Sequence, residues 1–181
     1  MRGGMIRRLL AVGLAALVPL VVSAGPAGAQ TPAEPVVLAG YRGELVDLAK
    51  GWNGAQACVV LSRAKVTCYD TTAQADAALG YSATADPLVS AAVSPSCPGG
   101  WLCLYADRYG GGRRLQFRDE YWQYLSSYGF DRTTSSWRNA QYGGDYGLLS
   151  YYNYGSSWNL PTGTYANSLG TYDNQAYRVY G

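Results

Sequence analysis

Short segments in the C-terminal half of the chain alternate between apolar and polar residues, or place apolar side chains at every second position. They are residues 101–105, 113–117, 148–152 and 156–160. Successive side chains of a β-strand point to opposite faces, so this spacing is typical of strands with one buried face. Glycine-containing turns separate the two segments of each pair. The pattern therefore predicts two pairs of strands joined by tight turns.

The same part of the chain repeats itself. The segments Asp131–Trp137 and Asp173–Val179 have the same length, and their aspartates lie 42 residues apart. A repeat of about 40 residues with four short strands is typical of a Greek-key motif. Two such motifs packed face to face form a β-sandwich. We therefore predict an all-β domain over residues 97–181, built from two Greek-key motifs.

A small unit is predicted before this domain, over residues 40–81. Residues 57–69 hold two β-branched stretches around a polar turn, which predicts a hairpin. We expect a short helix within residues 41–51. The segment Thr71–Gln74 resembles a capping box that starts an alanine-rich helical turn. About 40 residues bury little core, so this unit needs a disulfide or docks on the larger domain.

Two segments without periodicity connect these parts. Residues 82–96 are mostly Ala, Ser, Val and Pro, and we interpret them as a linker. Residues 30–39 are interpreted as a flexible lead-in. Composition changes at residue 97: of the 17 tyrosines, 14 lie in residues 97–181, together with four of the five tryptophans and both phenylalanines.

The first 29 residues have the pattern of a secretory signal peptide. Three arginines precede an apolar run over residues 9–22, and the small residues Ala27, Gly28 and Ala29 follow it. A run of 14 residues is short for a membrane span. We predict cleavage after Ala29 and an extracellular protein with no membrane segment after cleavage; an uncleaved anchor is the alternative.

Charge and composition exclude several classes of function. The full chain carries 14 Lys and Arg residues against 12 Asp and Glu, but three of the arginines and none of the acids lie in residues 1–29. The remainder therefore has a net charge of −1, and no basic stripe remains that would attract nucleic acid. The chain has no histidine, which excludes Ser-His-Asp and Cys-His catalytic centres and His-ligated zinc sites.

Catalysis by paired carboxylates is not indicated either. Asp119 and Glu120 are adjacent, so on a strand they point to opposite faces. We find no HExxH, P-loop or GxSxG motif in the sequence. We therefore predict that the protein is not an enzyme.

The four cysteines are predicted to form two local disulfides. Four cysteines allow three pairings, but Cys58 with Cys68 and Cys97 with Cys103 each bracket a turn. Export would place them in an oxidising compartment, where disulfides persist. Neither spacing is the CxxC of a redox site, so we interpret both pairs as structural.

Several blocks of the C-terminal domain resemble a known family. They are Cys97–Tyr105 (CPGGWLCLY), Gly111–Phe117 (GGRRLQF), Leu125–Phe130 (LSSYGF) and Ser135–Trp137 (SSW). Together they look like the βγ-crystallin-type domain of the secreted bacterial peptidase inhibitor family, whose founding members inhibit metalloproteinases. The resemblance implies a wedge of two Greek keys, and a rigid loop that occludes a thermolysin-like protease.

The sequence departs from that family in two features: the turn before residues 113–117 and the disulfide that braces the reactive segment. The crystallin signature places an aromatic residue at 110 and glycine at 112, whereas here the aromatic residue is Tyr109. Inhibitory members have a second disulfide that braces the reactive segment, and this chain has no cysteine after Cys103. Inhibition therefore requires that packing provide the brace, or it has been lost.

The resemblance also raises calcium as a ligand. The crystallin calcium motif is Asn/Asp, Asn/Asp, two residues, Ser/Thr, Ser. The first copy keeps Asp131, Ser135 and Ser136 but has Arg132 in the second position, and the second keeps only Asp173 and Asn174. Calcium needs six to eight oxygens. The alternative is that both aspartates cap turns through Asx hydrogen bonds. We expect no cofactor, with calcium as the one candidate.

The sequence thus predicts a secreted, monomeric inhibitor of an extracellular protease. The candidate inhibitory loops are residues 139–145 and 161–169, between which the sequence does not choose. The alternative is a non-inhibitory binding or structural module of the cell envelope that holds glycan or weak calcium. Tyrosines around residues 142–146 and 151–154 would then form an aromatic platform, although strand alternation favours burying half of them in the core.

Overall fold

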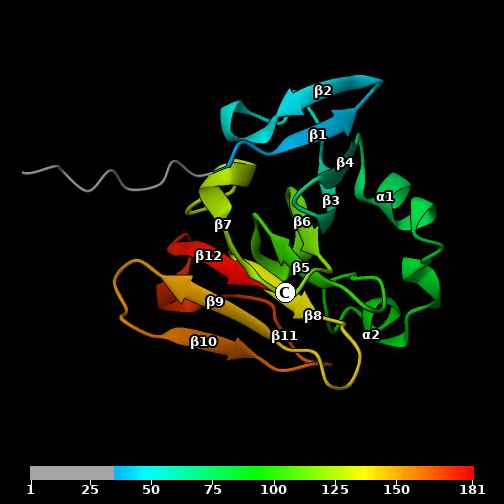
Figure 1. The fold of residues 1–181 in the computed structure, drawn as a ribbon. Helices are drawn as coiled ribbons and strands as arrows, with labels where there is room; N and C mark the ends of the chain where they lie inside the picture. Colours follow the sequence, from blue (N-terminus) through cyan, green and yellow to red (C-terminus); the bar gives the residue numbers. More distant parts are fainter. Residues whose placement is uncertain (1–34) are drawn as a thin grey trace, which may run out of the picture. The chain divides into compact units, whose positions relative to one another are not determined.

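The structure is a computed structural model that describes residues 35–181, in which twelve strands form an eight-stranded and a four-stranded sheet (Figure 1). The predicted signal peptide and the start of the lead-in lie outside these residues. The strands are β1 (Leu38–Tyr41), β2 (Glu44–Asp47), β3 (Ala57–Ser62), β4 (Lys65–Tyr69), β5 (Leu102–Tyr105), β6 (Arg114–Phe117), β7 (Trp122–Tyr124), β8 (Ser136–Asn139), β9 (Gly147–Tyr151), β10 (Ser157–Leu160), β11 (Tyr165–Ala166) and β12 (Ala176–Tyr180).

The helices of residues 35–181 are short. The α-helices are α1 (Thr72–Ala78) and α2 (Pro87–Ser90). The 3₁₀ helices are η1 (Leu48–Lys50), η2 (Ala83–Ala85), η3 (Arg108–Gly110), η4 (Leu125–Tyr128) and η5 (Gly170–Tyr172). No helix in this part of the chain has the length and apolar character that a membrane crossing requires.

Two Greek keys, β5–β8 and β9–β12, form the sandwich predicted from the repeat. The strand orders are β6-β5-β8-β11 in one sheet and β10-β9-β12-β7 in the other, so each key gives its third strand to the sheet of its partner. This exchange differs from the simpler expectation of one key packed on the other. The all-β, two-Greek-key fold class is confirmed.

The two keys are related by an approximate twofold axis, as two backbone hydrogen bonds between them show. The Arg132 N–H donates to the Ala176 carbonyl over 2.9 Å, and the Asn174 N–H donates to the Thr134 carbonyl over 3.0 Å. The two donors are 42 residues apart, and so are the two acceptors. Both donors have left-handed backbones, with φ of 51° and 57°. The predicted equivalence of the two segments therefore holds at the level of single hydrogen bonds.

Apolar side chains from both sheets fill the space between them. Leu104, Leu115, Phe117, Leu149 and Val179 are fully buried there. They come from alternate positions of their strands, as a half-buried strand requires. Burying one such side chain contributes about 1.5–3 kcal/mol, so this layer is the main source of stability for the two keys.

Residues 37–69 extend one sheet instead of forming a separate core. Strand β3 pairs with β6 in parallel, with Cys58 opposite Leu115, and β4, β1 and β2 follow in that order. Most of their buried side chains join the same hydrophobic cluster as those of the sandwich, whereas Ala57 and Val59 join the second cluster. The predicted hairpin is present, and Cys58 pairs with Cys68 across it.

The short helix expected within residues 41–51 is confined to the 3₁₀ helix η1 (Leu48–Lys50). Strands β1 and β2 form a hairpin before it, with Tyr41 opposite Glu44 and positive φ at both turn residues, Arg42 (51°) and Gly43 (83°). Two positive φ values at the centre are what a type I′ hairpin turn needs, and glycine favours them. Leu45 is exposed and Val46 is buried, which is strand alternation. Val37 and Ala39, placed in the lead-in, are also buried.

Residues 70–97, which we call the cover segment, pack on the outer face of the eight-stranded sheet. Helix α1 starts as predicted, with the Thr71 hydroxyl accepting a hydrogen bond from the Gln74 N–H. The fully buried Arg114 of β6 pairs with Asp76 over 2.5 Å, and Arg138 of β8 pairs with Asp86 over 2.7 Å. The predicted linker therefore includes η2 and α2 and is anchored to the sheet.

Candidate functional site

The two predicted inhibitory loops meet at Asn139, the last residue of β8. Asn139 is fully buried. Its side-chain N–H donates to the Leu160 carbonyl over 2.7 Å, and its side-chain oxygen accepts from the Gln141 N–H over 2.9 Å. Its backbone exchanges hydrogen bonds with Gly163 and Thr164. One amide side chain and its backbone thus hold the starts of both loops.

The exposed tip of the first loop is the turn Tyr142–Asp145. The Asp145 N–H donates to the Tyr142 carbonyl, closing the turn. The Thr162 hydroxyl of the second loop donates to the Asp145 carbonyl over 2.6 Å. Tyr142 is 65% exposed, with Gly143 and Gly144 exposed beside it. The arrangement presents a convex turn that is supported from behind.

The Cys97–Cys103 disulfide lies under this turn. It closes the segment that contains Gly99 and Gly100, and the Tyr142 ring packs against both glycines, so that a Cβ on Gly100 would come within 2.9 Å of that ring. The Gly100 N–H also donates to the Ala140 carbonyl over 2.7 Å. Both predicted disulfides are therefore present, and one of them supports a predicted loop.

The turn before β6 accommodates its displaced aromatic residue through its backbone. Tyr109 has a left-handed φ of 58°, and Gly110 and Gly112 follow with 74° and 68°. The Ser136 hydroxyl accepts a hydrogen bond from the Gly110 N–H and donates to the Asp107 carbonyl. This hydroxyl, one of the predicted calcium donors, thus holds the turn.

The other predicted calcium donors have protein partners of their own. Asp131 accepts from the Tyr152 hydroxyl over 3.1 Å, and Asp173 pairs with Arg108 over 3.3 Å. The structure does bring Ser135 and Asn174 together across the twofold, with the hydroxyl donating over 3.4 Å. Among residues 35–181, no group of three or more His, Cys, Asp or Glu side chains lies close enough to hold a metal ion. Calcium binding stays a prediction from the resemblance, and these contacts argue against it.

A surface that the sequence indicated only in part lies on the outer face of the four-stranded sheet. We call it the tyrosine face: Trp122, Tyr124, Tyr146, Tyr152, Tyr177, Arg178 and Tyr180. The rings form two rows. Tyr177 lies between Tyr124 (6.3 Å between centroids) and Tyr152 (4.8 Å), and Tyr180 lies between Trp122 (5.7 Å) and Tyr146 (5.1 Å).

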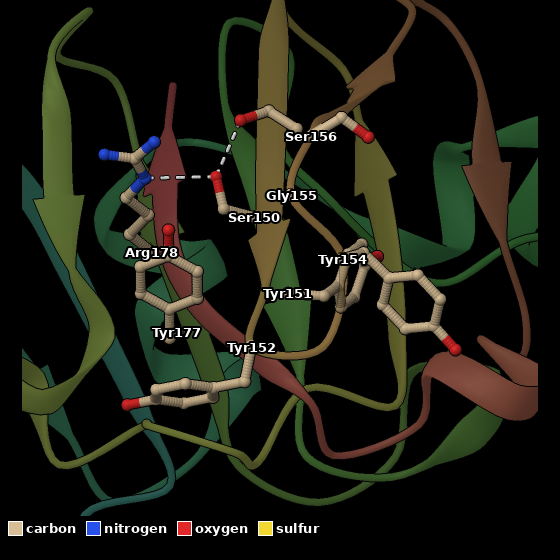
Figure 2. A pocket seen from close by; sticks show the side chains of 9 residues that line it. Ser150, Tyr151, Tyr152, Tyr154, Gly155, Ser156, Tyr177 and Arg178 are labelled. Atoms are coloured by element: carbon tan, nitrogen blue, oxygen red, sulfur yellow. Dashed lines mark hydrogen bonds between the residues drawn. The ribbon is translucent and has the colours of Figure 1, made fainter.

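A β-bulge in β12 and the alternation of β9 explain this arrangement. The pairing of β12 with β9 shifts register between Ala176 and Arg178, which re-aims Tyr177. Figure 2 shows Tyr177, Arg178 and Tyr152 on one side of β9, and Tyr151 and Tyr154 on the other. Tyr151 is 1% exposed, whereas Tyr152 is 48% exposed. Alternation thus separates this pair, but Tyr151 alone is buried among the five tyrosines at residues 142–146 and 151–154, so the expectation that half of them are buried is wrong.

One pair of carboxyl groups was not found by sequence reasoning. Burial and a side-chain hydrogen bond with Asp145 raise the pKa of Glu120 above its ordinary value. The neighbouring Asp119 points elsewhere and accepts from the Gln123 amide over 2.6 Å. Asp119 and Glu120 thus have separate partners, as their adjacency predicted. Glu120 and Asp145 are 25 positions apart in the sequence, which hid their proximity.

Comparisons with known proteins add a distant structural likeness. No family model matches the chain, and no curated protein matches it. A solved βγ-crystallin from Ciona intestinalis matches with 21% sequence identity and a TM-score of 0.36, over 45% of this chain and 98% of the crystallin chain. The strand order and pairing described above, not this likeness, define the fold.

Proposed function

We propose that the protein is a secreted, non-enzymatic inhibitor of an extracellular protease, of the metalloproteinase class, which it blocks by inserting the turn Tyr142–Asp145 into the active cleft. The leader pattern and the blocks from Cys97 to Trp137 support this from the sequence. Two disulfides, typical of proteins in oxidising compartments, support an extracellular location.

The observation that carries the proposal is the bracing of this turn without a second disulfide. Asn139 and Thr162 hold it from behind, and the Cys97–Cys103 segment packs against Tyr142. A loop that is ordered before binding loses less conformational entropy when it docks. A braced loop also keeps its ends together if a protease cleaves it. Packing thus supplies the support that the family resemblance assigns to a disulfide.

Titration of a thermolysin-like protease with the purified protein tests the proposal. We expect residual activity to fall to near zero at micromolar excess. Tyr142→Ala removes the most exposed ring of the turn and should weaken inhibition by about tenfold or more, as loss of an interface anchor does. Asn139→Ala removes the brace, so the turn should be cleaved faster, which mass spectrometry of the reaction mixture detects.

The matched control is Tyr124→Ala, which removes an exposed tyrosine of similar size far from the turn in sequence and on a different strand. It should inhibit as the unmodified protein does. Full protease activity at micromolar excess, across metallo-, serine and cysteine proteases, would contradict the proposal. Equal loss of inhibition in both tyrosine variants would show that the turn is not the contact.

A further inference from the structure

The outer faces of the two sheets differ in how their arginines are paired. On the eight-stranded sheet, Arg114 and Arg138 each bond a carboxylate of the cover segment, Asp76 and Asp86. On the four-stranded sheet, the Arg178 Nε–H donates to the Ser150 hydroxyl over 3.1 Å. None of the five ion pairs found within residues 35–181 involves Arg178.

The guanidinium of Arg178 is held in place by aromatic rings. It lies 4.3 Å from the Trp122 ring centre and 5.5 Å from that of Tyr177, which are cation–π distances. Figure 2 shows its terminal nitrogens pointing away from Ser150. A fixed guanidinium with free donors is pre-organised to bind a planar oxyanion such as a carboxylate. Arg178 itself therefore fits an anionic group of an occupant.

The side chains around Arg178 are mainly aromatic and hydroxylated, and the aliphatic Leu148, two residues before Ser150 in β9, is half-buried. Tyr124, Tyr146 and Tyr152 are 45–48% exposed on this face. The exposed large aliphatic side chains of residues 35–181 all lie between Val36 and Val93, outside it. Ring faces with hydroxyls at their edges offer the apolar faces of sugar rings a flat contact, and offer sugar hydroxyls donors and acceptors. Trp, Tyr and Arg are also common in protein interfaces, so the experiment below includes a polypeptide probe.

A hollow of about 280 Å³ adjoins Arg178 and is lined by polar groups. The hydroxyls of Ser150 and Ser157 bond each other over 2.7 Å at its base, and Ser156 lies beside them. Tyr152 and Tyr177 form its aromatic wall. A few converging polar groups beside aromatic walls are typical of a site for a small polar ring.

We propose that the tyrosine face binds an acidic polysaccharide. Its sugar rings stack on the row Tyr124, Tyr177 and Tyr152. One of its carboxylates pairs with Arg178, as Asp76 and Asp86 pair with arginines of the eight-stranded sheet. The site is separate from the turn Tyr142–Asp145 and does not depend on protease inhibition.

The test uses one polymer in two charge states. Oligogalacturonate, a chain of uronic acid rings, is titrated into the full protein by calorimetry at low salt, and the fully methyl-esterified oligomer serves as the neutral counterpart. We expect the acid form to bind at least about tenfold more tightly, the loss expected for a charge-assisted hydrogen bond. Poly-glutamate of matched charge serves as the polypeptide probe and should bind more weakly than oligogalacturonate.

Substitutions in the tyrosine face test whether the polymer binds there. Arg178→Gln should abolish the preference for the acid form, and Tyr177→Ala should weaken binding about three- to tenfold. Tyr124→Ala keeps Arg178 and its neighbours, so it tests the row if Tyr177→Ala fails to fold. The controls are Tyr142→Ala and Arg42→Gln, an exposed tyrosine and an exposed arginine elsewhere. Both should bind as the unmodified protein does.

Four results would overturn the proposal: no binding of oligogalacturonate, equal binding of the acid and the esterified form, equal binding of poly-glutamate, or binding that the face variants leave unchanged. Because no protease is present, these results are independent of the inhibition assay. A protein that inhibits without binding oligogalacturonate keeps the proposed function and loses this inference.

Discussion

The outer faces of the two sheets are built on related backbones, but the cover segment packs on one of them and the other is exposed. On the eight-stranded sheet the cover segment buries Trp101, Cys103 and Tyr105 in a second hydrophobic cluster and pairs both arginines. On the four-stranded sheet the tyrosine face is open within the described part of the chain, and its tyrosines contact one another and solvent. The two keys are nevertheless related closely enough to exchange equivalent backbone hydrogen bonds.

This difference shows that the side chains, and not the Greek-key backbone, decide which face is available for binding. The covered face holds polar side chains that water does not reach, and those of Arg114 and Arg138 find carboxylate partners in the cover segment, whereas the buried Gln116 amide has no hydrogen-bond partner in the described part of the chain. The tyrosine face holds amphipathic rings, which remain soluble when exposed and present contact area at little entropic cost. Stability is therefore concentrated in the covered sheet, whereas the open sheet leaves its aromatic rings available for the proposed polysaccharide.

Among the tests of this contrast, Asp76→Ala should have the largest effect on stability. The substitution leaves the Arg114 guanidinium fully buried without a counter-charge. Loss of one member of a buried pair costs about 3–5 kcal/mol, and the free energy of unfolding in urea should fall by that amount. Lys50→Ala, which breaks an exposed pair with Asp47, is the control and should cost under about 1 kcal/mol. Similar small losses in both variants would mean that the cover segment contributes little.

The disulfides should have the next largest effect. Both lie in or beside the covered sheet. The double variant Cys58→Ser with Cys68→Ser opens a loop with a sequence separation of 10, for which chain entropy predicts a loss of about 2–3 kcal/mol. Hydrogen exchange should rise mainly in β3 and β4. Exchange that rises first in β9 and β12 would contradict the assignment of stability to the covered sheet.

The pair between Arg138 and Asp86 gives a smaller effect that depends on pH. Burial alone would raise the pKa of Asp86, but hydrogen bonds from Arg138 and Tyr81 lower it below its ordinary value of 3.8. The ionised carboxylate therefore stabilises the fold above that value, and its contribution is lost as pH falls through the lowered pKa. Asp86→Asn keeps the cap of α2 and should cost about 1–2 kcal/mol at pH 7. Unfolding at pH 7 and pH 2.5 measures it: the two proteins should converge in acid.

Residues with local signals could be predicted from the sequence. The strands β5, β6, β9 and β10 follow period-two patterns, the cystine pairs bracket turns, and Asp131 with Asp173 marks the repeat. The hairpin at Arg42 and Gly43 also carried a signal, glycine in a two-residue turn, which the apolar residues on either side obscured. These features depend on neighbours within about ten residues or on an internal copy.

Long-range pairings could not be predicted. The exchange of β7 and β11 between sheets, the parallel pairing of β3 with β6, and the ion pair of Arg114 with Asp76 join residues 27 or more apart, without a local pattern. The tyrosine face depends on a single bulge at Tyr177, because a shift of one residue decides which side chains point outward. The brace at Asn139 likewise depends on the position of β8 beside β11.

The smallest expected effect concerns calcium, at the loops where the two keys meet. Asp173 is paired with Arg108, and the Ser136 hydroxyl already holds the turn before β6, so an ion would have to displace protein partners. A site with a Kd of about 0.1 mM would add about 2.7 kcal/mol at 10 mM calcium, and the melting temperature would rise by several degrees. We expect no rise in 10 mM calcium chloride relative to the same concentration of magnesium chloride. A rise that Asp131→Ala abolishes would show instead that the two loops form a cation site.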